Sequence, residues 1–179
     1  MIKTEELRLT QEWDKTEEMT AAKPPCGCTA AHRAKIADRN VFEAADAFGI
    51  GAPNDAYAQY FIGQSYLKPL TEFGKSAVFL ANVTFEPGCR NNWHIHHASS
   101  GGQILVCTAG EGWYGEEGKP VRSLTPGTVI TIPANVKHWH GAKADSWFSH
   151  IAVEVPGTDA SNEWCEPVTD KEYAVLAEN

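Results

Sequence analysis

The sequence predicts an all-β fold, an antiparallel sandwich or barrel with a partly helical extension at its N-terminus. Short runs of β-branched and aromatic residues follow one another from about residue 55, separated by turns containing glycine or proline. No long helical segment lies between these runs, which argues against alternating strand and helix units. Two histidine pairs, each spaced i and i+2, suit strands because alternate strand residues share one face.

Residues 1–54 differ in composition from the rest and are expected to form the extension. Acidic helix-forming residues open it, and the run 23–28, with two consecutive prolines, ends any helix there. Residues 30–48 are rich in alanine and are expected to form a second short helix. Cys26 and Cys28 could be a redox or metal pair, although two thiolates alone do not complete a zinc site.

Residues 55–179 are expected to form a single barrel domain that ends in a short helix. The expected strands are 57–62, 76–85, 103–108, 112–114, 128–132 and 149–155. Near the C-terminus, Thr169 and Glu172 have the spacing of a capping box, which predicts the start of the helix.

The composition argues against several classes of partner. A formal net charge of -8 disfavours nucleic acid and anionic membrane surfaces. No stretch approaches the roughly 20 apolar residues of a membrane span, and the N-terminal residues lack the apolar region of a signal peptide. The 5 cysteines are an odd, scattered set, which is not a disulfide framework. We therefore expect a cytoplasmic protein that acts on a small molecule.

Four of the 7 histidines form the two pairs, His94 with His96 and His138 with His140. On a helix the members of a pair would diverge by roughly 200°, whereas two strands would direct all four imidazoles into one cavity. Imidazole is the commonest metal ligand in proteins. The alternative is chance clustering, or a pair that faces solvent on an edge strand.

The residues around the pairs resemble the two sequence motifs of the cupin superfamily. The first block contains Gly88, His94, His96, Gln103 and Gly110, and the second contains Gly127, Pro133, Asn135 and His138. The resemblance covers about residues 55–175. It implies a jelly-roll β-barrel with one divalent metal ion inside.

The resemblance implies His94, His96, Gln103 and His138 as the metal ligands. Gln103 stands where the superfamily usually has a glutamate, after a longer gap than usual. Its amide oxygen can bind a metal but brings no charge, so the ion keeps its full positive charge and is a stronger Lewis acid. Asn135 replaces a turn glycine, and asparagine tolerates a positive φ.

The segments around both motifs are most similar to a small bacterial subgroup of cupins. It includes the cupin-type hydroxynitrile lyases, with a manganese centre held by three histidines and a glutamine, and cupins labelled with carboxymuconolactone decarboxylases. The resemblance implies a metal-dependent C–C lyase with manganese as the first choice of metal and iron, nickel or zinc as alternatives. The other functions to consider are a cupin dioxygenase or isomerase, and a metal-binding cupin that binds a small ligand without catalysis.

His140, His150 and Glu154 are the predicted catalytic residues beside the metal. If His138 faces inward, His140 does too, and His150 and Glu154 share one face of the strand 149–155. Two imidazoles and a carboxylate beside a Lewis acid suit proton transfer. The alternatives are a barrel histidine bonded to a backbone carbonyl, for His150, and a solvated rim residue, for Glu154, where the lyases carry glutamine.

The predicted substrate-binding residues are Asn91, Ala81 and Val83, which are expected to shape the cavity. Asn91 matches a cavity position in the resemblance. We also expect a homo-oligomer, a dimer or tetramer, because 6 tryptophans are many for a small barrel to bury alone.

Overall fold

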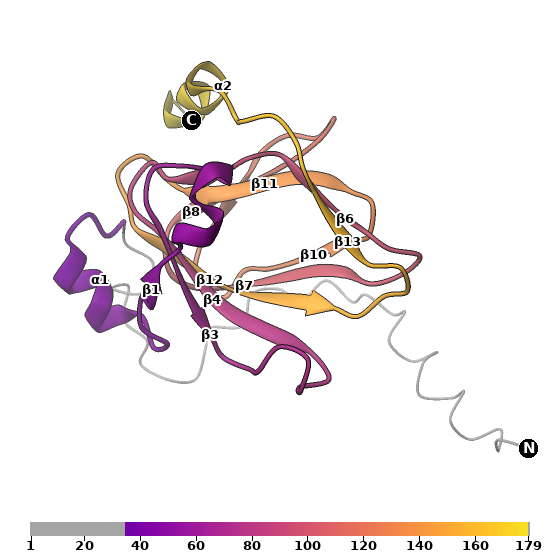
Figure 1. Ribbon diagram of the computed structural model, residues 1–179. Coiled ribbons are helices and arrows are strands. Elements are labelled where there is room, and N and C mark those ends of the chain that lie inside the picture. The colour runs from indigo at the N-terminus through magenta and orange to yellow at the C-terminus, as the bar shows by residue number, and fades with distance from the viewer. Residues whose placement is uncertain (1–34, 179) are drawn as a thin grey trace, which may run out of the picture.

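The computed structural model describes residues 35–178, which form two facing antiparallel sheets (Figure 1). In spatial order, the first sheet contains β1 (Ala52–Pro53), β3 (Ser65–Pro69), β4 (Phe79–Phe85), β12 (Phe148–Val155), β7 (Gly102–Gly110) and β10 (Val129–Pro133). The second contains β13 (Ser161–Trp164), β6 (His94–His97), β11 (Lys137–Ala142), β5 (Arg90–Asn91) and β2 (Phe61–Ile62), with β8 (Gly112–Glu116) beside β11 and β9 (Arg122–Leu124) beside β8. The predicted all-β jelly-roll is confirmed.

The inward faces of the strands divide the barrel interior into an apolar part and a polar part. On β7 the buried residues Gln103, Leu105 and Cys107 alternate with less buried ones, as they do on a strand with one face toward a core. Phe85, Leu105 and Phe148 are fully buried in the apolar cluster between the sheets. This packing leaves the polar inward residues around a cavity.

Helices cover both outer faces of the barrel (Figure 1). Helix α1 (Arg39–Ala45) begins at Asp38, whose side chain accepts a hydrogen bond from the Val41 backbone N–H. Its Phe42 is fully buried and stacks on Trp147 with ring centroids 5.5 Å apart. Helix α1 therefore covers Trp147, next to the first residue of β12, and the C-terminal helix covers tryptophans of the other sheet.

The C-terminal helix α2 (Asp170–Ala174) begins with the predicted capping box between Thr169 and Glu172. A 3-10 turn, η3 (Val175–Glu178), follows it. Tyr173 of α2 packs in one cluster with Trp139. Its hydroxyl donates a 2.7 Å hydrogen bond to the Ala142 carbonyl, which fixes the helix to β11.

The structure departs from the predicted strands in several places. Residues 57–60 of the expected strand 57–62 lie in a 3-10 helix, η2 (Asp55–Tyr60), because Tyr57 and Tyr60 pack their rings on Trp164 instead of alternating in a ladder. The strand expected from residue 76 begins at Phe79. Strands β1, β3, β5, β9 and β13 were not predicted from the sequence.

Part of the predicted extension lies outside the described residues, including Cys26 and Cys28. Within the described part, α1 occupies seven residues of the expected second helix. The domain boundary at residue 54 stays a prediction. No helix in residues 35–178 is both long enough and apolar enough to cross a membrane.

Candidate metal centre

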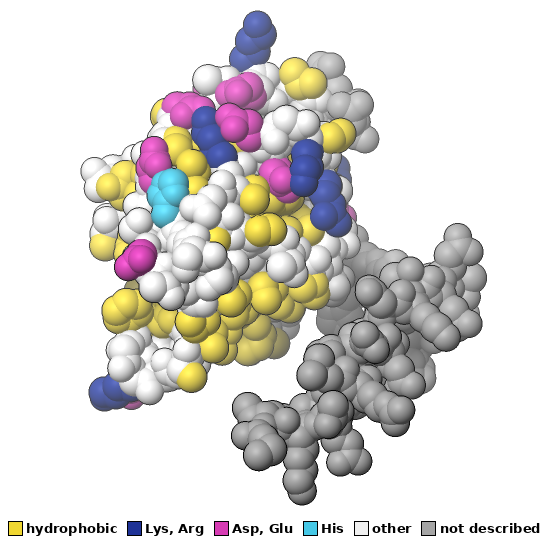
Figure 2. Space-filling model, turned by 90° about the vertical axis from the view of Figure 1, so that its right-hand side faces the viewer, with side chains coloured by type: hydrophobic (Ala, Val, Ile, Leu, Met, Phe, Trp, Pro, Cys, Tyr) yellow, Lys and Arg dark blue, Asp and Glu magenta, His cyan; other side chains and the backbone are white. Residues whose placement is uncertain are grey.

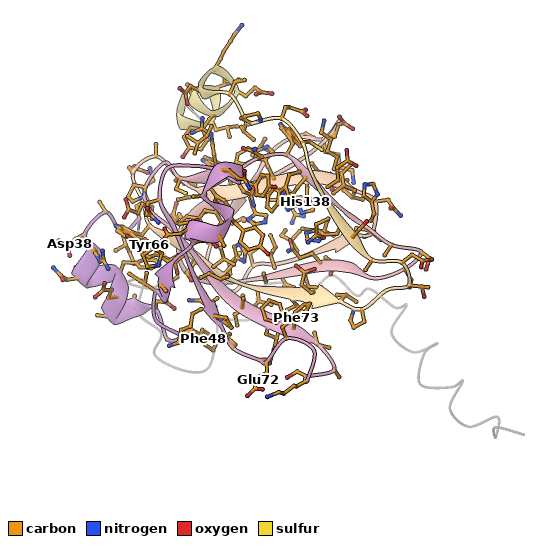
Figure 3. The ribbon with its side chains drawn as sticks, in the orientation of Figure 1. Asp38, Phe48, Tyr66, Glu72, Phe73 and His138 are labelled. Atoms are coloured by element: carbon orange, nitrogen blue, oxygen red, sulfur yellow. The ribbon has the colours of Figure 1, made fainter. Side chains whose placement is uncertain are left out.

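A cavity of about 150 Å³ opens between the sheets beside the histidine pairs. It is lined by the predicted residues Ala81, Val83, Asn91, His94, His96, Gln103, His140 and Glu154, together with Asn54, Tyr57, Phe61, Leu67, Phe79, Ala152, Asn162 and Trp164. His138 and His150 are not in its lining and are fully buried next to it. Figure 3 shows His138 in the interior, between the two sheets.

His94 and His138 lie directly opposite each other on β6 and β11, with ring centroids 4.1 Å apart. Nδ1 of His94 is 2.9 Å from the Asn92 carbonyl oxygen. Nδ1 of His138 is 2.9 Å from the Val136 carbonyl oxygen. A carbonyl only accepts, so each Nδ1 carries the proton and each Nε2 keeps a lone pair, which is the arrangement that orients histidine ligands.

Three of the four predicted ligands present buried ligand atoms that have no hydrogen-bond partner in the described structure. These atoms are both ring nitrogens of His96, Oε1 of Gln103 and Nε2 of His138. Leaving a buried polar atom unpaired costs about 1–3 kcal/mol, so such a cluster fits a bound cation. The residues present therefore fit the metal that the sequence predicts.

A second, overlapping combination of ligands exists. One ligand atom each of His94, His138 and His140 lies within 4.8 Å of the others, so this buried group could also hold a metal ion. His140 differs from the other two because both of its ring nitrogens already have partners. Its Nε2 lies 3.1 Å from Nδ2 of Asn91, and its Nδ1 lies 3.1 Å from Nε2 of His150.

Burial keeps four histidines neutral at pH 7, namely His94, His138, His140 and His150. Burial, followed by the neighbouring imidazole of His138, holds the pKa of His94 well below its ordinary value. Burial lowers the pKa of His138 to about 4 and that of His150 to about 3. The pKa of His140 is also well below its ordinary value, because of burial and then because of His150. Neutral imidazole is the form that binds metals and accepts protons.

Glu154 lies at the edge of the centre, half-buried, and contacts two predicted ligands. Its Oε1 accepts a 3.1 Å hydrogen bond from Nε2 of Gln103, and its Oε2 is 3.4 Å from Nδ1 of His96. Burial alone would raise the pKa of Glu154, but these contacts outweigh it and lower the pKa.

Comparison with known proteins agrees with this architecture. Residues 81–153 match the Cupin domain family model. The chain is 37% identical over 126 residues to the (R)-mandelonitrile lyase of Granulicella tundricola, covering 70% of this chain and 94% of the relative. The chain belongs to the cupin superfamily.

Two solved structures show how this cupin compares in three dimensions. A cupin-like protein from Thermotoga maritima is 40% identical, with a TM-score of 0.65 over 74% of this chain and 98% of the other. A cupin 2 conserved barrel domain protein from Rhodopseudomonas palustris is 16% identical, with a TM-score of 0.53 over 72% of this chain and 83% of the other. The second likeness concerns the fold alone.

The sequence analysis of this cupin missed the aromatic wall of the cavity. Trp164 stacks on Tyr60 with ring centroids 4.5 Å apart, and its ring lies 4.9 Å from that of His94. Trp164 ends β13, the polar strand Ser161–Trp164, which has no hydrophobic alternation to predict it. Only its pairing with β6 brings this tryptophan to the metal centre.

His97 lies apart from the centre, as its strand parity predicts. Its Nε2 is 2.6 Å from the Glu163 carboxylate, and its Nδ1 is 3.2 Å from the Asn135 side-chain oxygen. Both contacts are exposed. The contact with Glu163 raises the pKa of His97. His97 is therefore a matched control for the buried histidines.

Proposed function

We propose that this cupin is a metal-dependent C–C lyase that cleaves cyanohydrins, as its resemblance to hydroxynitrile lyases suggests. The observation that carries the proposal is the cluster of unpartnered ligand atoms beside His140, in a cavity whose remaining lining is mostly apolar. The 37% identity to an (R)-mandelonitrile lyase supports the choice of reaction.

We propose His94, His96, Gln103 and His138 as the residues that hold one divalent transition metal, manganese by preference. The three imidazoles offer ring nitrogens and the glutamine offers an amide oxygen, which together form a mixed nitrogen and oxygen set. Such an ion, when bound, supplies a Lewis acid that lowers the pKa of a substrate hydroxyl.

His140 is the residue that moves the proton. The Oδ1 of Asn91 accepts a 2.9 Å hydrogen bond from the His140 backbone N–H, so the amide NH₂ of Asn91 must face the imidazole ring. Its nearer ring contact, at 3.1 Å, is with Nε2 of His140. Nε2 therefore holds the lone pair, and Nδ1 carries a proton that it donates to His150.

Cyanohydrin cleavage then needs one proton acceptor that returns the proton. The substrate hydroxyl replaces the Asn91 amide at Nε2 of His140 and transfers its proton to that nitrogen. The bond between the carbinol carbon and the nitrile carbon then breaks, and a carbonyl forms. The departing cyanide takes the proton back from His140 and leaves as hydrogen cyanide. His150 does not line the cavity, so it acts by holding the tautomer of His140.

The walls of the cavity suit a small substrate with an apolar body. Ala81, Val83 and Ala152 are small side chains on one wall, and Trp164 lies on another. A volume of about 150 Å³ limits the inner cavity to a small molecule. We propose that Ala81, Val83 and Asn91 determine which cyanohydrins fit.

The test is cleavage of mandelonitrile by manganese-loaded protein, followed by the ultraviolet absorbance of benzaldehyde. A general acid–base group contributes about a hundred- to ten-thousand-fold in rate, so His140→Ala should lose activity on that scale and keep its metal. His97→Ala, the exposed control, should keep full activity. No cleavage of any cyanohydrin with manganese, iron, nickel or zinc would contradict the proposed reaction.

A further inference from the structure

The predicted ligand set carries no negative charge, and one carboxylate stands beside it. The ligands are three histidines, which bind metals as neutral imidazoles, and an amide, where cupins usually add a glutamate. Among the described residues that line the cavity, Glu154 is the only acidic one, and none is a lysine or arginine. Any compensation of a divalent charge within this lining comes from Glu154.

Glu154 and Gln103 are direct cross-strand partners. They are paired in register between β12 and β7, so both side chains leave the sheet on the same face. The register of the two strands is enough to bring the Glu154 carboxylate next to the Gln103 amide. The backbone geometry therefore supports the contact independently of the side-chain positions.

The hydrogen bond between the two side chains fixes which way the amide points. A carboxylate can only accept, so the Gln103 group at 3.1 Å from Oε1 of Glu154 must be the NH₂. The amide oxygen of Gln103 is then directed away from Glu154, and this Oε1 atom is buried without a partner among the described residues. Without Glu154, either end of the amide could face the centre.

The second oxygen of the same carboxylate faces another predicted ligand. Oε2 of Glu154 is 3.4 Å from Nδ1 of His96, and neither ring nitrogen of His96 has a hydrogen-bond partner within residues 35–178. An acceptor on the Nδ1 side favours the tautomer whose Nε2 has a lone pair. The Glu154 carboxylate thus contacts two of the four predicted ligands, Gln103 and His96.

We propose that Glu154 is a positioning residue of the metal centre, which orients Gln103 and His96 and supplies from the neighbouring strand the negative charge that Gln103 lacks. The inference rests on the metal site of the proposed function. In this arrangement the carboxylate polarises the amide, and the Gln103–Glu154 pair does the work of the usual glutamate ligand.

The test measures manganese(II) affinity of the whole chain by the electron paramagnetic resonance signal of free manganese, without any substrate. Partners that orient metal ligands typically contribute about 10- to 100-fold in affinity. Glu154→Ala removes both the acceptor and the charge and should weaken binding by about 100-fold. Glu154→Gln keeps an acceptor for the amide and loses the charge, so it should weaken binding by about tenfold.

The double variant Gln103→Glu with Glu154→Gln moves the carboxylate onto the ligand position and should restore wild-type affinity. Glu111→Gln is the matched control, because Glu111 is also a half-buried carboxylate but pairs with Lys143. It should bind manganese like the wild type. Thermal unfolding of each metal-free variant shows whether a loss of manganese affinity comes from a loss of fold. Recovered affinity in the double variant would not be explained by fold stability alone.

Wild-type affinity in Glu154→Ala would overturn the inference and leave the metal site intact. A double variant that binds manganese no better than Glu154→Ala would also overturn the inference. A carboxylate at position 103 would then fail to replace the Gln103–Glu154 pair. A wild-type chain that takes up no manganese, iron, nickel or zinc would overturn the metal site and this inference together.

Discussion

Nε2 of His150 lies 3.1 Å from Nδ1 of His140, and both rings are buried. This contact makes His150 the acceptor for the Nδ1 proton of His140. The ring of His150 also lies among aromatic side chains, 5.6 Å from the centroids of both Phe85 and Phe148. The pair therefore joins the apolar core to the cavity.

Replacing His150 with phenylalanine should lower cyanohydrin turnover without removing the metal. Phenylalanine fits the aromatic surroundings but cannot accept the proton from His140, so the imidazole loses the bond that fixes its tautomer. One such bond contributes about 1–1.5 kcal/mol, or roughly tenfold in rate. Steady-state kinetics at saturating metal would measure this loss of turnover. Unchanged turnover would show that His140 does not need the hydrogen bond to His150.

The low pKa of His150 predicts acid sensitivity of the metal-free protein. Its pKa is about 3 in the folded state against an ordinary value of 6.5, so between these values the unfolded chain binds a proton that the folded chain does not. The contribution of His150 to the free energy of unfolding is therefore at its maximum above about pH 6.5 and declines as the pH falls toward 3.

His150→Phe should reduce this pH dependence by up to about 1.4 kcal/mol per pH unit, the value for one proton. Urea unfolding of both metal-free proteins at several pH values between 3 and 7 measures the slope. Parallel curves for the two proteins would mean that His150 does not carry this proton linkage.

The burial of Phe42 predicts that the segment before residue 55 stabilises the barrel. Its side chain is fully buried against Trp147, and truncating a buried phenylalanine to alanine costs about 3–5 kcal/mol. Phe42→Ala should therefore lower the unfolding free energy by that amount. Val41→Ala, one residue away and 57% exposed, should change it by less than about 0.5 kcal/mol. Equal effects of the two substitutions would contradict the packing of α1.

The predicted dimer or tetramer has a direct test. Phe73 is 84% exposed and lies at the lower edge of Figure 3. Figure 2 shows hydrophobic side chains gathered on the lower half of one face, with most charged side chains above them. Light scattering should give at least twice the chain mass of 19.6 kDa. A mass near 19.6 kDa would refute the oligomer.

The sequence predicted the parts of the fold that carry periodic or motif signals. The spacing of His94, His96, His138 and His140 requires only that alternate strand residues share a face, and the structure brings these rings together. Thr169 and Glu172 likewise start a helix through a local hydrogen-bond pattern that needs no tertiary contact.

The remainder depends on contacts between distant segments. Tyr57 and Tyr60 lie in a 3-10 helix because Trp164, a hundred residues later, receives their rings. Parity placed His150 inward but could not show that His140 stands between it and the cavity. The pairing of Glu154 with Gln103 follows from the register of β7 and β12, which no local pattern specifies.

The most direct test of the account is the metal content of single-histidine variants, measured by elemental analysis after loading with manganese and desalting. The four-ligand centre predicts about one equivalent in the wild type and in His140→Ala, and a large loss in His96→Ala. The alternative group of His94, His138 and His140 predicts a large loss of metal in His140→Ala and about one equivalent in His96→Ala. Full metal in His96→Ala together with loss in His140→Ala would contradict the ligand assignment on which the proposed chemistry depends.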